Sequence, residues 1–389
     1  FSSDIFLNEA PLQPIISQQP CVGESNEEEL EPRLLGGHES GFKNRGERPD
    51  KKIYEAINKE SKVDFWTNPR GLKMCTRSFH PEEKNDKPEA LLFFFHGIGA
   101  HVHRGFVDSK GNPSNDLLVG RRAAEKGWAA FFLDAEGHGH SEGEFIYVPS
   151  HYDCVTDALE YIKHTVSKYP GVPWFVMGES WGGNISLNLG LQLQKRPEGV
   201  NIDDWYGVLL VAPAVIGDLP PCPVVFTLRY CCAPCCPKWT PFFMPNPVSA
   251  DRIWRDEEVM KYVEEVDELG NGGNAFRLGT AVSMLKAVED MQMAVSEIQY
   301  PFAVAHGGHD EAVKIEGTEL LMSSSKTPKQ HKEQRTFKDA YHDLLGDPDR
   351  NEVVTFLFEW AETRLKNKDE LRAVKVLGNK QELKLEEKI

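Results

Sequence analysis

The sequence contains no apolar run of the roughly 18–20 residues that a membrane-spanning helix needs. Its longest apolar stretch, Val208–Ile216, is interrupted by Pro213. Positive charge is also scarce, because 44 Lys and Arg stand against 60 Asp and Glu, and the formal net charge is −16. A field of this sign argues against nucleic acid as a partner. The two absences therefore count against a spanning segment within these 389 residues and against a nucleic-acid-binding role.

Cysteine is sparse except in one segment, 222–236, which holds five of the eight in the chain. A disulfide framework is not expected in a chain of this length, and this usage favours a reducing compartment. We therefore expect a cytoplasmic or peripheral membrane protein. The run Cys231–Cys236 has three interpretations: a metal site, acylated thiols that dip into a membrane surface, or small apolar residues packed inside a cap.

Buried strands alternate with helices through the middle of the chain. Continuous apolar runs of the kind seen at 91–95 are typical of strands that are buried on both faces. Further runs of this kind lie at 128–133, 174–177, 208–212 and 302–305, and apolar residues follow at helical spacing at 155–166 and 353–360. This alternation predicts a mostly parallel central sheet with helices on both faces.

Composition divides the chain into four parts. Residues 1–50, rich in Glu, Gln, Pro and Gly, are expected to form a disordered or loosely packed arm, and residues 366–389 a charged tail. Residues 51–214 and 299–365 form the predicted α/β core. Residues 215–298 are first rich in Pro, Cys and aromatics and then helical, which indicates an inserted cap over the carboxyl edge of the sheet.

The sequence Gly178-Glu179-Ser180-Trp181-Gly182 lies between a predicted strand and a predicted helix. Such a tight turn leaves room only for small residues on either side of the serine and points its hydroxyl outward. Residues 185–193 alternate with period two, which favours a strand. We nevertheless predict a helix there, because the turn requires one and a buried helix is apolar over most of its surface. Ser180 is therefore the expected nucleophile.

A serine hydroxyl needs a base that is oriented by an acid, and in this kind of fold the order along the chain is serine, acid, histidine. Asp310 follows the predicted strand 302–305, and His342 lies between a further predicted strand and the last helix. We expect these two residues to complete the triad. Alternatives for the two roles are His306, His309, His331, Asp339, Asp343 and Asp347, which we interpret as core, loop, turn or surface residues.

Stabilising the negative charge that develops on the substrate carbonyl needs two backbone N–H groups. Trp181 supplies one by its position after Ser180, and Ile98 supplies the other from the glycine-containing loop after the strand 91–95. His138 and His140 have no further ligand at zinc spacing, so we interpret their segment as a turn. No metal and no cofactor are expected.

Taken together, these motifs resemble the monoacylglycerol lipase-like serine hydrolases of the α/β-hydrolase superfamily, in particular their plant and algal branch, which includes enzymes described as lysophospholipase-like. The resemblance extends from about Val63 to Leu365. The motifs that carry it are His96-Gly97-x-Gly99-x-His101, Asp134-x-Glu136-Gly137-His138-Gly139-x-Ser141, Gly178-Glu179-Ser180-x-Gly182-Gly183 and Tyr341-His342.

The resemblance implies a carboxylic ester hydrolase with Ser180, Asp310 and His342 as its triad and Ile98 and Trp181 as oxyanion donors. The expected substrate is a lipid ester, monoacylglycerol, cleaved to glycerol and a fatty acid in an apolar tunnel beneath a cap that contacts a membrane. Alternatives are a lysophospholipase, a small-ester esterase, a lipid acyltransferase or a non-catalytic lipid-binding relative. Trp181 departs from the family, which usually has Met there.

Overall fold

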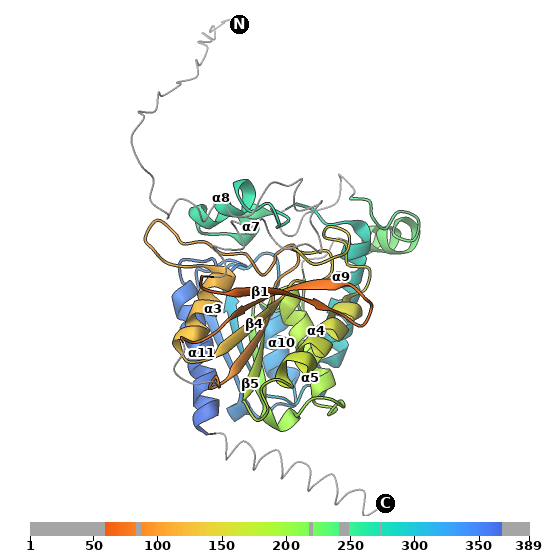
Figure 1. The fold of residues 1–389 in the computed structure, drawn as a ribbon. Helices are drawn as coiled ribbons and strands as arrows, with labels where there is room; N and C mark the ends of the chain where they lie inside the picture. Colours follow the sequence, from red (N-terminus) through yellow and green to blue (C-terminus); the bar gives the residue numbers. More distant parts are fainter. Residues whose placement is uncertain (1–58, 83–86, 218–220, 241–248, 273, 368–389) are drawn as a thin grey trace, which may run out of the picture.

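A computed structural model of the protein describes residues 59–82, 87–217, 221–240, 249–272 and 274–367 (Figure 1). Within them, eight strands form one sheet in the order β1-β2-β4-β3-β5-β6-β7-β8. Every pair from β4 to β8 in this order is parallel, whereas β1 and β2 join antiparallel. The strands are β1 (Lys62–Thr67), β2 (Lys73–Phe79), β3 (Leu91–Phe95), β4 (Ala129–Leu133), β5 (Trp174–Glu179), β6 (Trp205–Val211), β7 (Phe302–Gly307) and β8 (Lys332–Phe337).

The sheet separates two apolar cores, as the continuous apolar strands predict. Leu91, Phe93 and Phe95 of β3 face one core, and Leu92 and Phe94 face the other, because successive strand residues point to opposite faces. The first core is covered by α4 (His151–Val166), α5 (Trp181–Leu193) and α10 (Glu316–Ser324), and the second by α3 (Asn115–Glu125) and α11 (Arg350–Lys366). The prediction of a mostly parallel sheet with helices on both faces is confirmed.

Helix α5 resolves the period-two pattern at residues 185–193. All five apolar side chains of that pattern are buried, because α5 packs against β5, α4 and α9 (Leu278–Ala294) at once. A helix that is surrounded in this way can be apolar all round, so alternation along its sequence carries no strand signal. The helix prediction was correct.

The remaining elements lie between β6 and β7 or are short turns. Figure 1 shows α7 and α8 at the upper end of the sheet, above the ends of the parallel strands, while α9 returns beside α4. The predicted cap boundaries stay a prediction, and the predicted N-terminal arm and most of the predicted C-terminal tail lie outside the described residues. The remaining helical elements are η2 (Ile202–Asp204), α6 (Cys222–Thr227), η3 (Leu228–Cys232), α7 (Ala250–Ile253), α8 (Glu257–Glu265), η4 (Val295–Glu297) and η5 (Lys329–His331). In the described part of the chain, no helix combines the length and apolarity needed to cross a bilayer.

Candidate active site

Ser180 lies in the turn between β5 and α5, where the sequence predicts it. Its backbone has φ 54° and ψ −116°, a region that residues with a side chain rarely adopt. Neighbouring backbone holds this conformation, because Ser180 N donates to Val211 O (2.9 Å) and Ser180 O accepts from Ala214 N (2.9 Å). The strand that follows in the sheet therefore fixes the strained turn.

The glycines around Ser180 are required by close backbone contacts. A Cβ on Gly182 would lie 2.0 Å from Phe95 O, and a Cβ on Gly178 would lie 2.2 Å from Gly182 O. Backbone atoms on rigid elements cannot move aside as a flexible side chain could. The steric argument made from the five-residue motif therefore applies to the folded chain.

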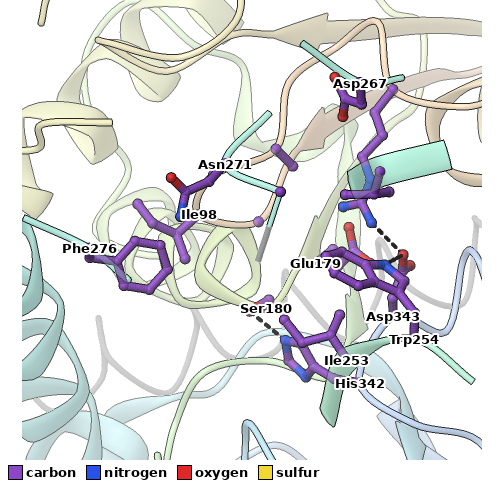
Figure 2. Close-up of a pocket in the computed structure, with 16 residues that line it drawn as sticks. Ile98, Glu179, Ser180, Ile253, Trp254, Asp267, Asn271, Phe276, His342 and Asp343 are labelled. Atoms are coloured by element: carbon purple, nitrogen blue, oxygen red, sulfur yellow. Dashed lines mark hydrogen bonds and ion pairs between the residues drawn. The ribbon is translucent and has the colours of Figure 1, made fainter. Parts of the chain in front are cut away.

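Ser180, His342 and Asp310 form one hydrogen-bonded chain, although they come from three separate segments. His342 Nε2 lies 2.8 Å from Ser180 Oγ, and His342 Nδ1 lies 2.7 Å from Asp310 Oδ2. Figure 2 shows Ser180 and His342 facing each other at the base of a cavity. This is the arrangement in which an imidazole can accept the proton of a serine hydroxyl.

Electrostatics keeps Asp310 charged and supports a proton on His342. Burial alone would raise the pKa of the Asp310 carboxyl, but the charges and hydrogen bonds of His342 and His306 hold that pKa well below its usual range. Burial lowers the pKa of His342, but Asp310 outweighs this and raises it above the ordinary value of 6.5. The carboxylate thus stabilises the imidazolium that forms when His342 takes a proton.

His306 has a role at this site that the sequence interpretation missed. It was assigned to the core at a strand end, and it is indeed buried at the end of β7. However, its Nε2 lies 3.3 Å from Asp310 Oδ2 and its Nδ1 lies 2.7 Å from Thr318 Oγ1. Asp310 Oδ1 also accepts from two backbone N–H groups, so the acid is held on both oxygens. Of the other histidine alternatives, His309 is exposed and His331 contacts Arg364.

The loop after β3 is fixed against Ser180 by a buried histidine. His96 Nε2 accepts from Ala135 N (3.1 Å) and His96 Nδ1 lies 2.7 Å from Gly97 O. Burial lowers the pKa of His96 to about 4, so it is neutral with its proton on Nδ1. Gly97 packs against Ser180, since a Cβ at Gly97 would lie 3.4 Å from Ser180 Cβ. The next residue is Ile98, whose N–H is one of the two predicted oxyanion donors.

Trp181, the other predicted oxyanion donor, is the first residue of α5 and is buried. Its indole N–H donates to His151 Nδ1 (3.0 Å), and its ring stacks on His138. The large side chain that replaces the usual Met of the family is therefore directed into the core. The assignment of Trp181 and Ile98 as oxyanion donors remains a prediction.

The cavity above Ser180 measures about 50 Å³. This volume has room for a few water molecules and not for a fatty acyl chain, so the expected apolar tunnel is not formed by the described residues. Apolar and polar side chains share the lining, as Figure 2 shows. The apolar side chains are Ile98, Ile253, Trp254, Val263 and Phe276, and the polar ones include Arg104, Glu179, Asp267, Asn271 and Asp343.

Asp343 connects the segment that carries His342 to three other elements. We interpreted it as a turn residue, and its Oδ1 does accept from Gly346 N (2.9 Å). In addition, Oδ2 accepts from Trp254 Nε1 (2.6 Å) and from Arg104, and Oδ1 accepts from Asn115 Nδ2 (2.9 Å). The turn interpretation was therefore incomplete.

Glu179, next to Ser180, lies in the same buried polar group. Burial and the neighbouring Asp343 carboxylate raise the pKa of Glu179 well above its usual value of 4.5, and Arg104 opposes this only in part. The raised pKa disfavours two buried negative charges side by side.

A second buried ion pair joins the loop of Ile98 to the segment after α8. His101 Nε2 lies 2.7 Å from Asp267 Oδ1, and the two side chains are 0% and 1% exposed. Burial lowers the pKa of His101, but Asp267 outweighs this and raises it above 6.5. Beside this pair, Asn271 N donates to Gly99 O (2.8 Å). Nothing in the sequence singled out Asp267.

Among the described residues, Cys75, His103 and Asp134 bring metal-ligating atoms within 4.8 Å of one another. Both oxygens of Asp134 already accept backbone N–H groups, from Val102 (2.7 Å) and His140 (2.9 Å). Asp134 therefore holds the loop after β3 through its hydrogen bond from Val102 N, and we assign no metal to the group.

Comparison with known proteins now identifies the family. Residues 86–349 match the family described as serine aminopeptidase, S33. The monoglyceride lipase of Rattus norvegicus is 30% identical over 285 residues, which cover 72% of this chain and 84% of the relative. The chain belongs to the serine aminopeptidase S33 family. The caffeoylshikimate esterase of Arabidopsis thaliana is 24% identical over 328 residues, covering 82% of this chain and 91% of that protein.

Solved structures of similar fold agree with this family. A soluble variant of monoglyceride lipase from Saccharomyces cerevisiae, bound to a substrate analogue, aligns with a TM-score of 0.60 at 17% identity, covering 79% of this chain and 96% of that one. A carboxyl esterase from Bacillus coagulans aligns with a TM-score of 0.60 at 14% identity, covering 79% and 99%. The α/β-hydrolase fold and the resemblance to monoacylglycerol lipases are confirmed, and the protein is an ester-cleaving serine hydrolase of this kind. The plant and algal branch stays a prediction.

Proposed function

We propose that the protein hydrolyses monoacylglycerol to glycerol and a free fatty acid, with Ser180, His342 and Asp310 as its catalytic residues. The observation that carries this proposal is the hydrogen-bonded chain from Ser180 Oγ through His342 to Asp310 at the base of a cavity. The substrate class comes from the named activity of the rat relative. No metal or cofactor takes part.

In the first half of the reaction, Ser180 Oγ attacks the ester carbonyl while His342 Nε2 takes its proton. The negative carbonyl oxygen is stabilised by the backbone N–H groups of Ile98 and Trp181. His342 then donates the proton to the departing glycerol oxygen. Water, activated by the same imidazole, cleaves the acyl-serine ester and restores the enzyme.

The substrate is expected to enter only when the segment over the cavity moves. An acyl chain gains ~0.8 kcal/mol for each buried CH₂, so a long chain needs an apolar channel much larger than the present cavity of about 50 Å³. Ile253, Val263 and Phe276 line that cavity from the segment between β6 and β7. Their displacement would open apolar surface beside Ser180. We propose that this occurs at a lipid surface, with the protein cytoplasmic or peripherally bound.

A small-ester esterase is the second function that an observation favours. The caffeoylshikimate esterase relative aligns over 91% of its length, and the small cavity suits a compact acyl group. Lysophospholipase and lipid acyltransferase activities use the same acyl-serine intermediate and differ only in the leaving group or acceptor.

A fluorophosphonate probe tests the nucleophile. The wild-type protein should be labelled, whereas Ser180→Ala should not be, because the probe reacts with an activated serine. Monoacylglycerol, lysophospholipid and phenolic esters should then be assayed in parallel. Equal labelling of the variant would refute the role of Ser180, and turnover of the phenolic ester alone would replace the lipid substrate with the esterase alternative.

A further inference from the structure

The segment 219–250 contains no Asp or Glu, although the chain has 60 acidic residues and a net charge of −16. The charged residues of this segment are Arg229 and Lys238. An anionic lipid surface repels acidic side chains and attracts basic ones. Arg229 pairs with Glu289 and Lys238 with Glu144, both outside the segment, so the segment itself brings no acidic side chain to a bilayer surface.

Part of this segment forms a small lobe, residues 222–239, with an inner and an outer face. On the inner face, Leu228 and Ala233 pack against Leu278 of α9. On the outer face, Phe226 and Tyr230 lie one helical turn apart, 61% and 60% exposed, with their ring centroids 4.9 Å apart. Helix α6 has no buried residue, although most of its side chains are apolar. An aromatic pair of this exposure favours an interface between apolar and aqueous phases.

Exposed thiols continue the outer face. Cys231 and Cys235 are exposed, as are Cys222 and Cys236, whereas Cys75 and Cys154 elsewhere in the described chain are buried. The helical turn extends past η3, since Cys236 N donates to Cys232 O (2.9 Å). Residues four positions apart in a helical turn share one side, so Cys231 and Cys235 lie together and next to Tyr230. Structural packing explains the inward Cys232 and not these two thiols.

We propose that Cys231 and Cys235 are sites of S-acylation that anchor the lobe 222–239 to a lipid bilayer. The thiolate of each cysteine attacks the carbonyl of a long-chain acyl thioester of coenzyme A. A new thioester forms on the protein, and the coenzyme leaves as its thiol. One acyl chain gives only reversible membrane binding, whereas two give stable anchoring, so a pair of thiols one turn apart fits the purpose.

This inference rests on the lipid-surface contact proposed above and not on catalysis, which lets the two be tested separately. The full chain is expressed as Ser180→Ala in eukaryotic cells that are fed an alkynyl fatty acid. The substitution removes the oxygen that would otherwise form an acyl ester and consume the donor. We expect label that neutral hydroxylamine releases, as it does for thioesters and not for oxygen esters.

The matched variant adds Cys231→Ser and Cys235→Ser, and it should lose most of the labile label, whereas Cys222→Ser should keep it. Absence of labile label on the full chain, or label that survives the double replacement, would overturn the assignment. Folding is checked on a separate protein that carries Cys231→Ser and Cys235→Ser but keeps Ser180. It should react with the fluorophosphonate probe at the wild-type rate, since neither cysteine contacts Ser180.

Vesicle flotation tests the anchoring. The acylated chain should float with vesicles of phosphatidylcholine and phosphatidylserine, and the fraction bound should fall about tenfold or more in the Cys231→Ser, Cys235→Ser variant. Equal flotation of the two proteins would refute anchoring by these acyl groups. The test has no activity readout, so a failure of the monoacylglycerol assignment would leave its outcome meaningful.

Discussion

Trp254 donates its indole N–H to Asp343 Oδ2 over 2.6 Å. Asp343 directly follows His342, and its backbone N–H also donates to Ile253 O (3.1 Å). Both the side chain and the backbone of Asp343 are therefore held by the segment that lies over Ser180. The residue next to His342 is therefore tied to that covering segment by two hydrogen bonds.

Trp254→Phe removes this hydrogen bond while keeping an aromatic ring. Hydrogen bonds to charged groups contribute about 1.5–3 kcal/mol, so we expect a loss of that size in the free energy of unfolding, measured with urea. If Trp254 positions His342, kcat for a short-chain ester should fall several-fold. Asp343→Asn and the double variant complete a cycle, in which the two effects should be less than additive. Additive losses, or an unchanged kcat, would mean that Trp254 does not act through Asp343.

The pH dependence of activity should follow His342. The free enzyme needs a neutral imidazole, and Asp310 raises the pKa of His342 above 6.5 despite its burial. The acid limb of kcat/KM should therefore lie above pH 6.5. Asp310→Asn should move this limb to lower pH and reduce kcat by about 10⁴-fold, because the tautomer is no longer held. A limb that stays in place in the variant would assign it to another group.

The buried pair of His101 and Asp267 should contribute strongly to stability. Removing one partner of such a pair costs about 3–5 kcal/mol, because the other is left buried and unpaired. Asp267→Asn should show a loss of this order, measured by urea unfolding at pH 6. The double variant His101→Gln, Asp267→Asn is the control, and it should recover part of the loss.

The sign of the pH dependence follows from the two pKa shifts of this pair. The pKa of His101 is raised, so its stabilisation is fully present below about pH 6.5 and is lost as the pH rises through the folded value. The pKa of Asp267 is lowered, so its stabilisation is present above about pH 3.8 and is lost as the pH falls through the folded value. The cost of Asp267→Asn should therefore be largest between about pH 4 and 6.5. A cost that grows above pH 7 would contradict the ion-pair assignment.

The sequence was sufficient for features that depend on one local rule. The run Leu91–Phe95 predicted a strand buried on both faces because two cores lie against it. The turn at Ser180 predicted a helix where periodicity favoured a strand, since the strain at the turn and the close backbone contacts of its glycines leave no other continuation. Asp310 and His342 were selected because each follows a strand at the carboxyl edge of the sheet, and the structure places both within hydrogen-bond distance of each other.

The features that were missed depend on contacts between distant segments. Asp267 has no local pattern, and its meaning comes from His101, 166 residues away along the chain. His306 ends a buried strand in the usual way, and only the fold brings it to Asp310. The strands β1 and β2 were not identified because neither is a continuous apolar run. The edge strand β1 has one buried residue, Val63, and β2 contains Thr76 and Arg77.

The turn at Ser180 should not tolerate a side chain at Gly182. A Cβ there would lie 2.0 Å from Phe95 O and 2.5 Å from His96 O, and both are backbone atoms at the end of β3. Gly182→Ala must therefore push α5 away from the loop that carries Ile98. Overpacking of this kind costs about 1–3 kcal/mol, and we expect the rate of fluorophosphonate labelling to fall by at least about tenfold.

The control is Gly111→Ala, where φ is 84° but no atom lies within 4 Å of the added Cβ. That variant should lose about 1–2 kcal/mol of stability from backbone strain and label at the wild-type rate. Normal labelling of Gly182→Ala would show that the spacing between α5 and β3 does not control the site.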